Sequence, residues 1–156
     1  MWLFENRVIA DIQDMPESCY GFIYMVTHIP TNRKYIGKKV LFFERNVKLG
    51  KKEKEELLQE RKNQGIGGRV PSKKKVVKES DWKTYYGSQA EIVKLVKEGD
   101  KSNFRREILK FVNNKKHLTY YECKYLFIYE VLENNEEYIN DNILAKFYSR
   151  DFKWLS

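Results

Sequence analysis

The fold of this chain is decided by the stretch GFIYMVTHIPTNRKYIGKK, residues 21–39. Its first part, residues 21–27, is apolar, β-branched and aromatic, and it predicts a strand. Residues 30–33 (Pro-Thr-Asn-Arg) are typical of a turn, and residues 34–43 predict a second strand. The two strands therefore predict an antiparallel hairpin with a loop somewhat longer than the tightest kinds.

Alternate side chains of a strand share a face, so Tyr35, Gly37 and Lys39 are expected to point the same way. Tyr24 on the partner strand can then converge with Tyr35 and Lys39. Gly37 between them would leave a gap in which a phosphate backbone could approach. An ordinary interpretation stays open, because tyrosines are common in strands and a strand glycine can mark a bulge.

Outward from the hairpin, the composition predicts a solvated helix over 51–63 and a basic loop at 72–75. A capping box at Ser88, with Glu91 three residues on, predicts the start of the next helix. Residues 103–112 predict a third strand. Thr119 is expected to cap a helix that runs to about residue 133.

This order of elements predicts an α+β fold: a small antiparallel three-stranded sheet flanked by helices, with a basic insert after the second strand. We expect an N-terminal extension over 1–20, one domain over 21–146 that contains the insert at about 44–79, and a tail over 147–156. The aromatic residues of this tail are Phe147, Tyr148, Phe152 and Trp154.

The chain has 156 residues and a net charge of +8, which favours a polyanionic partner, nucleic acid before an acidic membrane. Between Lys38 and Lys78 there are fourteen basic residues and five acids, a local charge of +9, so the remainder sums to −1. No stretch is long and apolar enough to span a bilayer, and the N-terminus lacks the pattern of a signal peptide. We expect a cytoplasmic protein with no membrane partner, and its two cysteines are expected to be free thiols.

Glu122 is one of few charged residues in the predicted helix after Thr119, which is apolar nearly all round. A carboxylate in such a place is either partnered or a ligand. A position near the helix N-terminus would keep it ionised. An isolated carboxylate suits Mg²⁺, which needs only one or two protein ligands. A cap or ion pair and a metal ligand both remain open, whereas the two histidines, His28 and His117, form no zinc cluster.

With these residues in place, GFIY…YIG resembles the GIY-YIG nuclease superfamily, over about residues 20–143. Further motifs support the resemblance: ESDWKTYYGS at 79–88, FRREIL at 104–109, LTYYE at 118–122 and a closing NDNIL at 140–144. Together they look like the small stand-alone GIY-YIG proteins of large tailed bacteriophages, some of which are homing-type endonucleases. The resemblance implies a DNA endonuclease that uses one divalent ion, Mg²⁺ or Mn²⁺.

The resemblance also implies roles for single residues. Tyr35 matches the general base, or the residue that orients the attacking water, and Tyr24 lies beside it in the same site. Glu122 matches the metal ligand. Asn140 matches the asparagine that orders the site, with Asn142 as its neighbouring candidate.

The chain departs from the family pattern at the cation that neutralises the transition-state phosphate. The family's usual arginine-bearing helix is replaced by the basic insert, and the common histidine near it has no clear match. The first triplet also carries one extra residue. Lys39 is the expected substitute because it shares the face of Tyr35, with Lys83 and Arg45 as alternatives.

Double-stranded DNA is the expected substrate, and the insert would contact its phosphates without reading sequence. The basic residues expected to contact DNA are Lys38, Arg45, Arg69, Lys73, Lys74, Lys75 and Lys83. Two other functions stay open: a non-catalytic DNA-binding or phage assembly or regulatory protein on the same fold, and a nicking or repair-type enzyme for branched DNA. The oligomeric state, monomer or homodimer, also stays open.

Overall fold

The predicted hairpin forms the centre of the computed structural model, which describes residues 1–152. Strand β3 (Gly21–His28) pairs with β4 (Arg33–Val40) in an antiparallel ladder of eight residue pairs. Tyr24 lies opposite Gly37 in this ladder. Directly opposed residues share a face of the sheet, so the expected alignment of the two tyrosines is confirmed.

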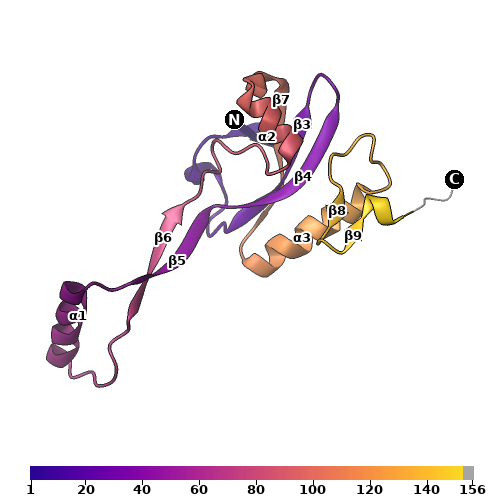
Figure 1. The fold of residues 1–156 in the computed structure, drawn as a ribbon. Helices are drawn as coiled ribbons and strands as arrows, with labels where there is room; N and C mark the ends of the chain where they lie inside the picture. The colour runs from indigo at the N-terminus through magenta and orange to yellow at the C-terminus, as the bar shows by residue number, and fades with distance from the viewer. Residues whose placement is uncertain (153–156) are drawn as a thin grey trace. The chain divides into compact units, whose positions relative to one another are not determined.

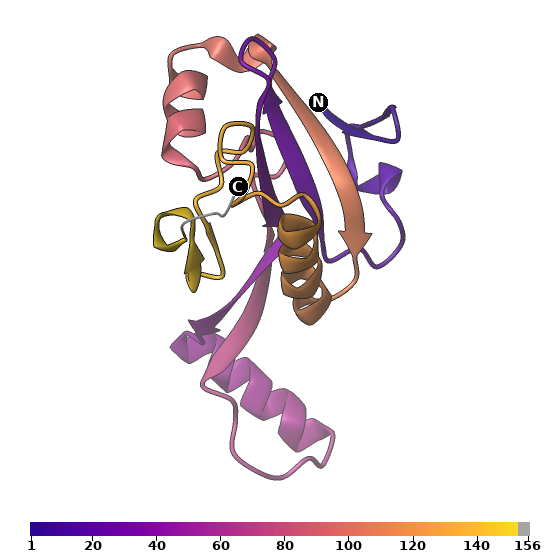
Figure 2. The ribbon, with the colours of Figure 1, turned by 90° about the vertical axis from the view of Figure 1, so that its right-hand side faces the viewer.

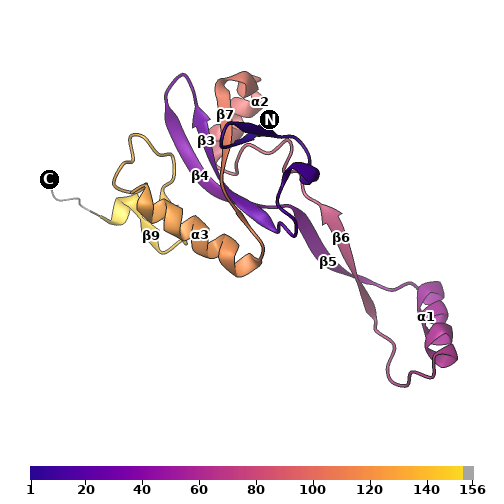
Figure 3. The same ribbon diagram turned by 180° about the vertical axis from the view of Figure 1, so that it is seen from behind.

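The sheet is larger than the three antiparallel strands that the sequence predicted. The expected third strand, β7 (Phe104–Val112), pairs antiparallel with β3, but β1 (Trp2–Phe4) then joins β7 in parallel, and β2 (Arg7–Ile9) joins β1. The order is β2-β1-β7-β3-β4, a mixed sheet of five strands. Figures 1 and 3 label β7, β3 and β4 of this sheet. The added strands are too short for a clear alternation, yet they bury Trp2 and Ile9 almost completely.

Helices α2 (Ala90–Lys97) and α3 (Lys115–Ile128) cover opposite faces of the sheet (Figure 2). On the α2 face, Ile92 packs in a core cluster with Trp2, Phe22, Tyr24 and Trp82. On the α3 face, another cluster forms, and its members include Ile23, Ile36, Leu118 and Leu126. The edge strand β4 therefore lies between two packed layers.

The predicted bounds of the helix at 119–133 are wrong at both ends. The side chain of Asn114 accepts a hydrogen bond from the backbone N–H of His117 at 2.8 Å, and this cap starts α3 earlier than Thr119. Thr119 is therefore an interior residue. Glu122 lies in the middle of α3, away from the helix N-terminus that was expected to keep it ionised.

Residues 42–80 form a second compact unit, distinct from the unit of residues 1–41 and 81–156. Strands β5 (Phe42–Lys48) and β6 (Lys73–Glu79) form an antiparallel two-stranded ribbon, and α1 (Lys51–Asn63) lies between them in the sequence. The predicted helix over 51–63 is confirmed.

Two predicted boundaries near this unit are wrong. The strand expected over 34–43 ends at Val40, and Phe42 and Phe43 belong to β5 instead. The basic stretch expected as a loop at 72–75 belongs to β6 from Lys73 onward. Its pairing partners lie in β5, 25 to 37 positions upstream, so its own lysine-rich composition hid it.

The rest of the described chain consists of short elements. The 3-10 helices cover Ile12–Asp14, Asp100–Asn103 and Ser149–Asp151, and β8 (Asn142–Ile143) pairs with β9 (Phe147–Tyr148). Within the predicted aromatic tail, the Phe147 ring lies 6.2 Å from that of Phe127, whereas Trp154 lies outside the described residues. Over residues 1–152, no helix has the length and apolar character needed to cross a membrane.

Candidate active site

A pocket of about 360 Å³ lies beside the edge strand β4. The strand, the start of α2, the middle of α3 and the segment after α3 all contribute side chains. The residues that line the pocket are Tyr35, Ile36, Lys38, Gln89, Glu122, Leu126, Ile139, Asn140, Asp141, Asn142 and Leu144. Five residues singled out by sequence therefore meet in one pocket: Tyr35, Lys38, Glu122, Asn140 and Asn142.

Asn140 closes the open edge of β4. Its side-chain amide accepts from the backbone N–H of Ile36 at 2.9 Å and donates to the carbonyl of Ile36 at 2.8 Å. The backbone just before Asn140 pairs with the backbone of Lys34. The N–H of Ile139 donates to the carbonyl of Lys34 at 2.7 Å, and the N–H of Lys34 donates to the carbonyl of Glu137 at 2.8 Å. The buried amide thus imitates one more strand residue, and it fixes the segment that carries Asp141 to the rim of the pocket.

Glu122 forms an ion pair with Lys38, whose Nζ lies 2.7 Å from Oε2 of the carboxylate. The same ammonium donates to Oγ1 of Thr119 at 3.3 Å. The Glu122 side chain is 20% exposed, so it can be reached from solvent. The roles left open for this carboxylate were a cap or ion pair and a metal ligand, and the structure shows the ion pair. A partly exposed ion pair contributes little free energy, so another cation can compete for the carboxylate.

Tyr35 presents its phenol to the pocket from the α2 face of the sheet. Burial raises the pKa of Tyr35 above its ordinary value; a hydrogen bond with Ser88 opposes this effect, and the charges of Glu122 and Asp141 add to it. A general base at Tyr35 would need a lowered pKa to act at neutral pH, and the structure shows the opposite direction. The phenol of Tyr35 therefore stays protonated at neutral pH.

Tyr24 supports Tyr35 from the interior of the sheet. Its side chain is 1% exposed and its ring centroid lies 6.2 Å from that of Tyr35. Burial raises the pKa of Tyr24 well above its ordinary value. A Cβ atom at Gly37 would lie 2.5 Å from the Tyr24 hydroxyl, so the gap at Gly37 holds the Tyr24 side chain and is not a space for a phosphate.

Lys39 lies on the same face as Tyr35, as expected, but it does not line the pocket. Its Nζ lies 2.5 Å from Oδ1 of Asp81 and 3.7 Å from the ring centroid of Tyr85. The Tyr85 ring in turn packs on Tyr24, with centroids 5.9 Å apart. Lys39 is thus part of the packing behind the pocket.

The donor set of the pocket fits a hard divalent cation. Glu122 and Asp141 supply carboxylate oxygens, and Mg²⁺ takes one or two carboxylates and completes its shell with water and substrate phosphate. Over residues 1–152, no group of three or more His, Cys, Asp or Glu side chains is placed to hold a metal ion.

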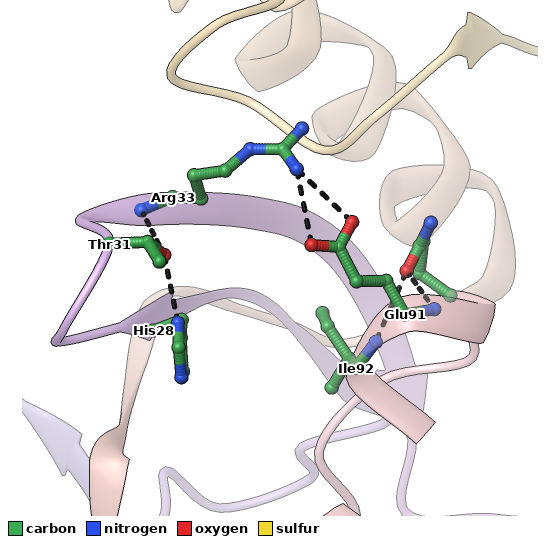
Figure 4. Close-up of polar contacts among 6 residues, drawn as sticks. His28, Thr31, Arg33, Glu91 and Ile92 are labelled. Atoms are coloured by element: carbon green, nitrogen blue, oxygen red, sulfur yellow. Dashed lines mark hydrogen bonds and ion pairs between the residues drawn. The ribbon is translucent and has the colours of Figure 1, made fainter. Parts of the chain in front are cut away.

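Gln89, which the sequence argument missed, borders the pocket and caps α2 in place of the predicted Ser88. Its Oε1 accepts from the backbone N–H of Glu91 at 2.6 Å and of Ile92 at 3.2 Å. Both carboxylate oxygens of Glu91 bind Nη1 of Arg33 at 3.1 Å (Figure 4). The start of α2 is thereby fixed to the start of β4. Glutamine is an unusual cap, so local sequence gave no signal for it.

His28 stabilises the turn of the hairpin. Its Nδ1 lies 2.8 Å from Oγ1 of Thr31 (Figure 4), and its Nε2 lies 2.9 Å from Oδ2 of Asp100. Both ring nitrogens are thus engaged. Neither His28 nor His117 lines the pocket beside β4.

The residues expected to contact DNA are distributed over both units. Lys38 lies in the pocket, and Lys83 lies 3.3 Å from Oδ2 of Asp11. The others belong to the unit of residues 42–80, where the carbonyl of Arg69 accepts from Arg61. Those in the β5–β6 ribbon are Arg45, Lys73, Lys74 and Lys75.

Comparison with known proteins gives one family. The family model described as "Putative endonuclease segE, GIY-YIG domain" matches residues 2–143, which include the whole unit of residues 42–80 and every residue that lines the pocket except Leu144. No curated protein and no solved structure matches the chain.

Proposed function

The chain belongs to the segE-type GIY-YIG endonuclease family of the phage homing-endonuclease kind, and from this premise we propose that it is a divalent-metal-dependent DNA endonuclease with its active site in the pocket beside β4. The observation that carries the proposal is that Tyr35, Glu122 and the Lys38 ammonium line this one pocket. Double-stranded DNA is the proposed substrate, cut by hydrolysis of a phosphodiester bond. A host cytoplasm is the proposed location if the chain is encoded by a phage.

Glu122 would hold Mg²⁺ or Mn²⁺, with Asp141 as a second carboxylate at the rim. Such an ion, when bound, polarises the scissile phosphate and offsets charge on the leaving oxygen. Tyr35 keeps its proton and orients the attacking water by hydrogen bonding, since its pKa is raised. Tyr24 fixes the ring of Tyr35, and Asn140 keeps the edge of β4 in place.

We assign the role of the family's usual arginine, which neutralises the transition-state phosphate, to Lys38 in place of Lys39. A cation that neutralises the transition-state phosphate must reach the pocket in which the phosphate lies. Lys38 lines the pocket, and its side chain is 36% exposed, whereas the Lys39 side chain is 9% exposed and contacts Asp81 and Tyr85. With Glu122 holding a divalent ion, the Lys38 ammonium would be available to the substrate phosphate.

We expect Lys38→Met to lower the single-turnover cleavage rate on the order of 100-fold, because the non-bridging oxygens of the phosphate lose a positioned cation. The matched variant Lys39→Met should leave the rate nearly unchanged, since methionine can replace the buried stem of that lysine. Circular dichroism and urea unfolding of both variants check that the fold is retained. A folded Lys39→Met protein that loses cleavage while Lys38→Met keeps it would reverse the assignment.

Cleavage of supercoiled plasmid tests the proposed function. With Mg²⁺ or Mn²⁺ we expect nicked circles first, because one active site cuts one strand at a time, and EDTA should abolish the reaction. Adding excess divalent ion back to the EDTA-treated protein should restore it, which excludes damage by the chelator. A folded protein that binds DNA yet cuts with neither metal would instead support a non-catalytic function.

That non-catalytic alternative, a DNA-binding or phage assembly or regulatory protein, is favoured by one observation. The Lys38 ammonium occupies the carboxylate that a metal would need. An enzyme for nicking or repairing branched DNA is a variant of the main proposal, and branched substrates in the same assay distinguish it. The division into an extension (1–20), a nuclease domain (21–146) and a tail (147–156) also stays a prediction.

A further inference from the structure

No buried core stabilises the β5–β6 ribbon. None of the residues 42–79 is buried, and Phe42, Phe43 and Val77 of the ribbon are exposed by 37–56%. An isolated two-stranded ribbon is marginally stable in water at best. A ribbon of seven residue pairs that exposes both faces is therefore built to be covered by a partner.

The charge of this unit indicates the chemistry of that partner. Residues 42–80 contain twelve basic and six acidic residues, a net charge of +6. The two strands alone carry six basic residues against Glu44 and Glu79. Two of these lysines are in ion pairs, Lys74 with Glu53 and Lys75 with Glu44. A polyanion is the complementary partner.

The register separates the ribbon into two unlike faces. Asn46 lies opposite Lys75, and Lys48 lies opposite Lys73, so these four exposed residues share one face, which we call the amide face. The other residues of this face are Phe42, Glu44, Val77 and Glu79. Lys74 lies on the other face, and its ammonium binds Glu53 of α1. A basic loop would not have two distinct faces, so the loop predicted from sequence implied contacts with phosphates alone.

We propose that the β5–β6 ribbon enters the major groove of DNA and that its amide face reads base edges there. The inference rests on the proposed function in taking DNA as the substrate. The major groove is wide enough for a two-stranded β-ribbon. Alternation of side chains along each strand aims the amide face at the floor of the groove, and Lys74 and Lys78 lie on the opposite face.

The residues of the amide face have the donors and acceptors that base edges require. The Asn46 side chain can donate to and accept from adenine, and the ammonium groups of Lys73 and Lys75 can donate to guanine. The Glu44 carboxylate, 2.7 Å from Lys75 on the same face, holds that lysine in place and can accept from cytosine. A preference for particular base pairs is the consequence, in addition to phosphate-driven affinity.

Selection from randomised duplexes tests this inference, with the full chain in EDTA so that binding is measured without cleavage. The affinities for the selected duplex and for a scrambled duplex are then compared at one salt concentration. We expect Asn46→Ala and Asn46→Val to reduce the ratio of these affinities about tenfold, with little change in affinity for the scrambled duplex. Asn63→Ala, at another exposed asparagine of the same unit, changes no charge either and should leave the ratio unchanged.

Valine is a strand former, so the Asn46→Val variant keeps the ribbon if alanine weakens it. Wild-type binding without any sequence preference, or a ratio unchanged in both Asn46 variants, would overturn the inference. In either case plasmid cleavage would still proceed with Mg²⁺, so the proposed nuclease function would stand. Absence of both DNA binding and cleavage would refute the proposed function and this inference together.

Discussion

Glu122→Gln is expected to abolish plasmid cleavage, with a fall in rate on the order of 1,000-fold or more. Glutamine keeps the shape of the side chain but removes the charge that would hold a divalent ion. The carboxylate is on α3, and among the described residues that line the pocket only Asp141 offers a second one. If the Glu122 carboxylate is removed, little remains in the pocket to hold the ion.

Two measurements separate loss of metal from loss of fold. Binding of Mn²⁺ to the protein without DNA, followed by electron paramagnetic resonance, should weaken in Glu122→Gln and remain in Glu133→Gln, a change of an exposed acid after α3. The free energy of unfolding should change by less than about 1 kcal/mol, since the Lys38–Glu122 pair is partly exposed and screened. Undiminished cleavage by Glu122→Gln would contradict its assignment as the metal ligand.

The central hairpin could be predicted from sequence because its information is local. The strand period of two assigned Tyr24, Tyr35 and Lys39 to one face without knowledge of any other element. The observed register, with Tyr24 opposite Gly37, agrees with that assignment. The same local signal was absent from the strands Trp2–Phe4 and Arg7–Ile9, which are too short to show an alternation.

The expected phosphate-neutralising lysine was Lys39, whereas the pocket contains Lys38. Assigning residues to a face of the sheet therefore does not tell which side chains line a pocket. Lys38 and Lys39 point to opposite faces, and only Lys39 shares the face of Tyr35. However, β4 is the edge strand, and a pocket at an edge receives side chains from both faces. Strand order depends on pairings between distant segments, such as β3 with β7, and no local pattern in β4 reports them.

Asn140 illustrates a second limit. The sequence indicated that an asparagine orders the site, but its contact is with the backbone of Ile36, 104 residues away in the chain. A backbone group looks the same at every residue, so sequence gives no clue to such a partner. The predicted start of α3 was wrong for a related reason. Asn114 and Thr119 are both good caps, and the packing of Leu118 against the sheet favours the earlier one.

Tyr35→Phe is expected to lower the cleavage rate on the order of 100-fold, because the attacking water loses the hydroxyl that orients it. The phenylalanine ring can keep the contact with the Tyr24 ring, whose centroid lies 6.2 Å away. The fold should therefore be retained, as checked by urea unfolding. Tyr120→Phe, a change at a tyrosine that is 60% exposed on α3, is the matched control.

The pH dependence of this variant distinguishes the two roles that were left open for Tyr35. Because its pKa is raised, the phenol stays protonated from pH 6 to 9, and a water-orienting role predicts the same ratio of wild-type to Tyr35→Phe rates throughout. If a phenolate acted as general base, its fraction would instead rise about tenfold for each unit of pH increase, as long as the pH stays below its pKa. The ratio of rates would then rise tenfold per unit, and single-turnover rates measured across this range would reveal that rise and refute the orienting role.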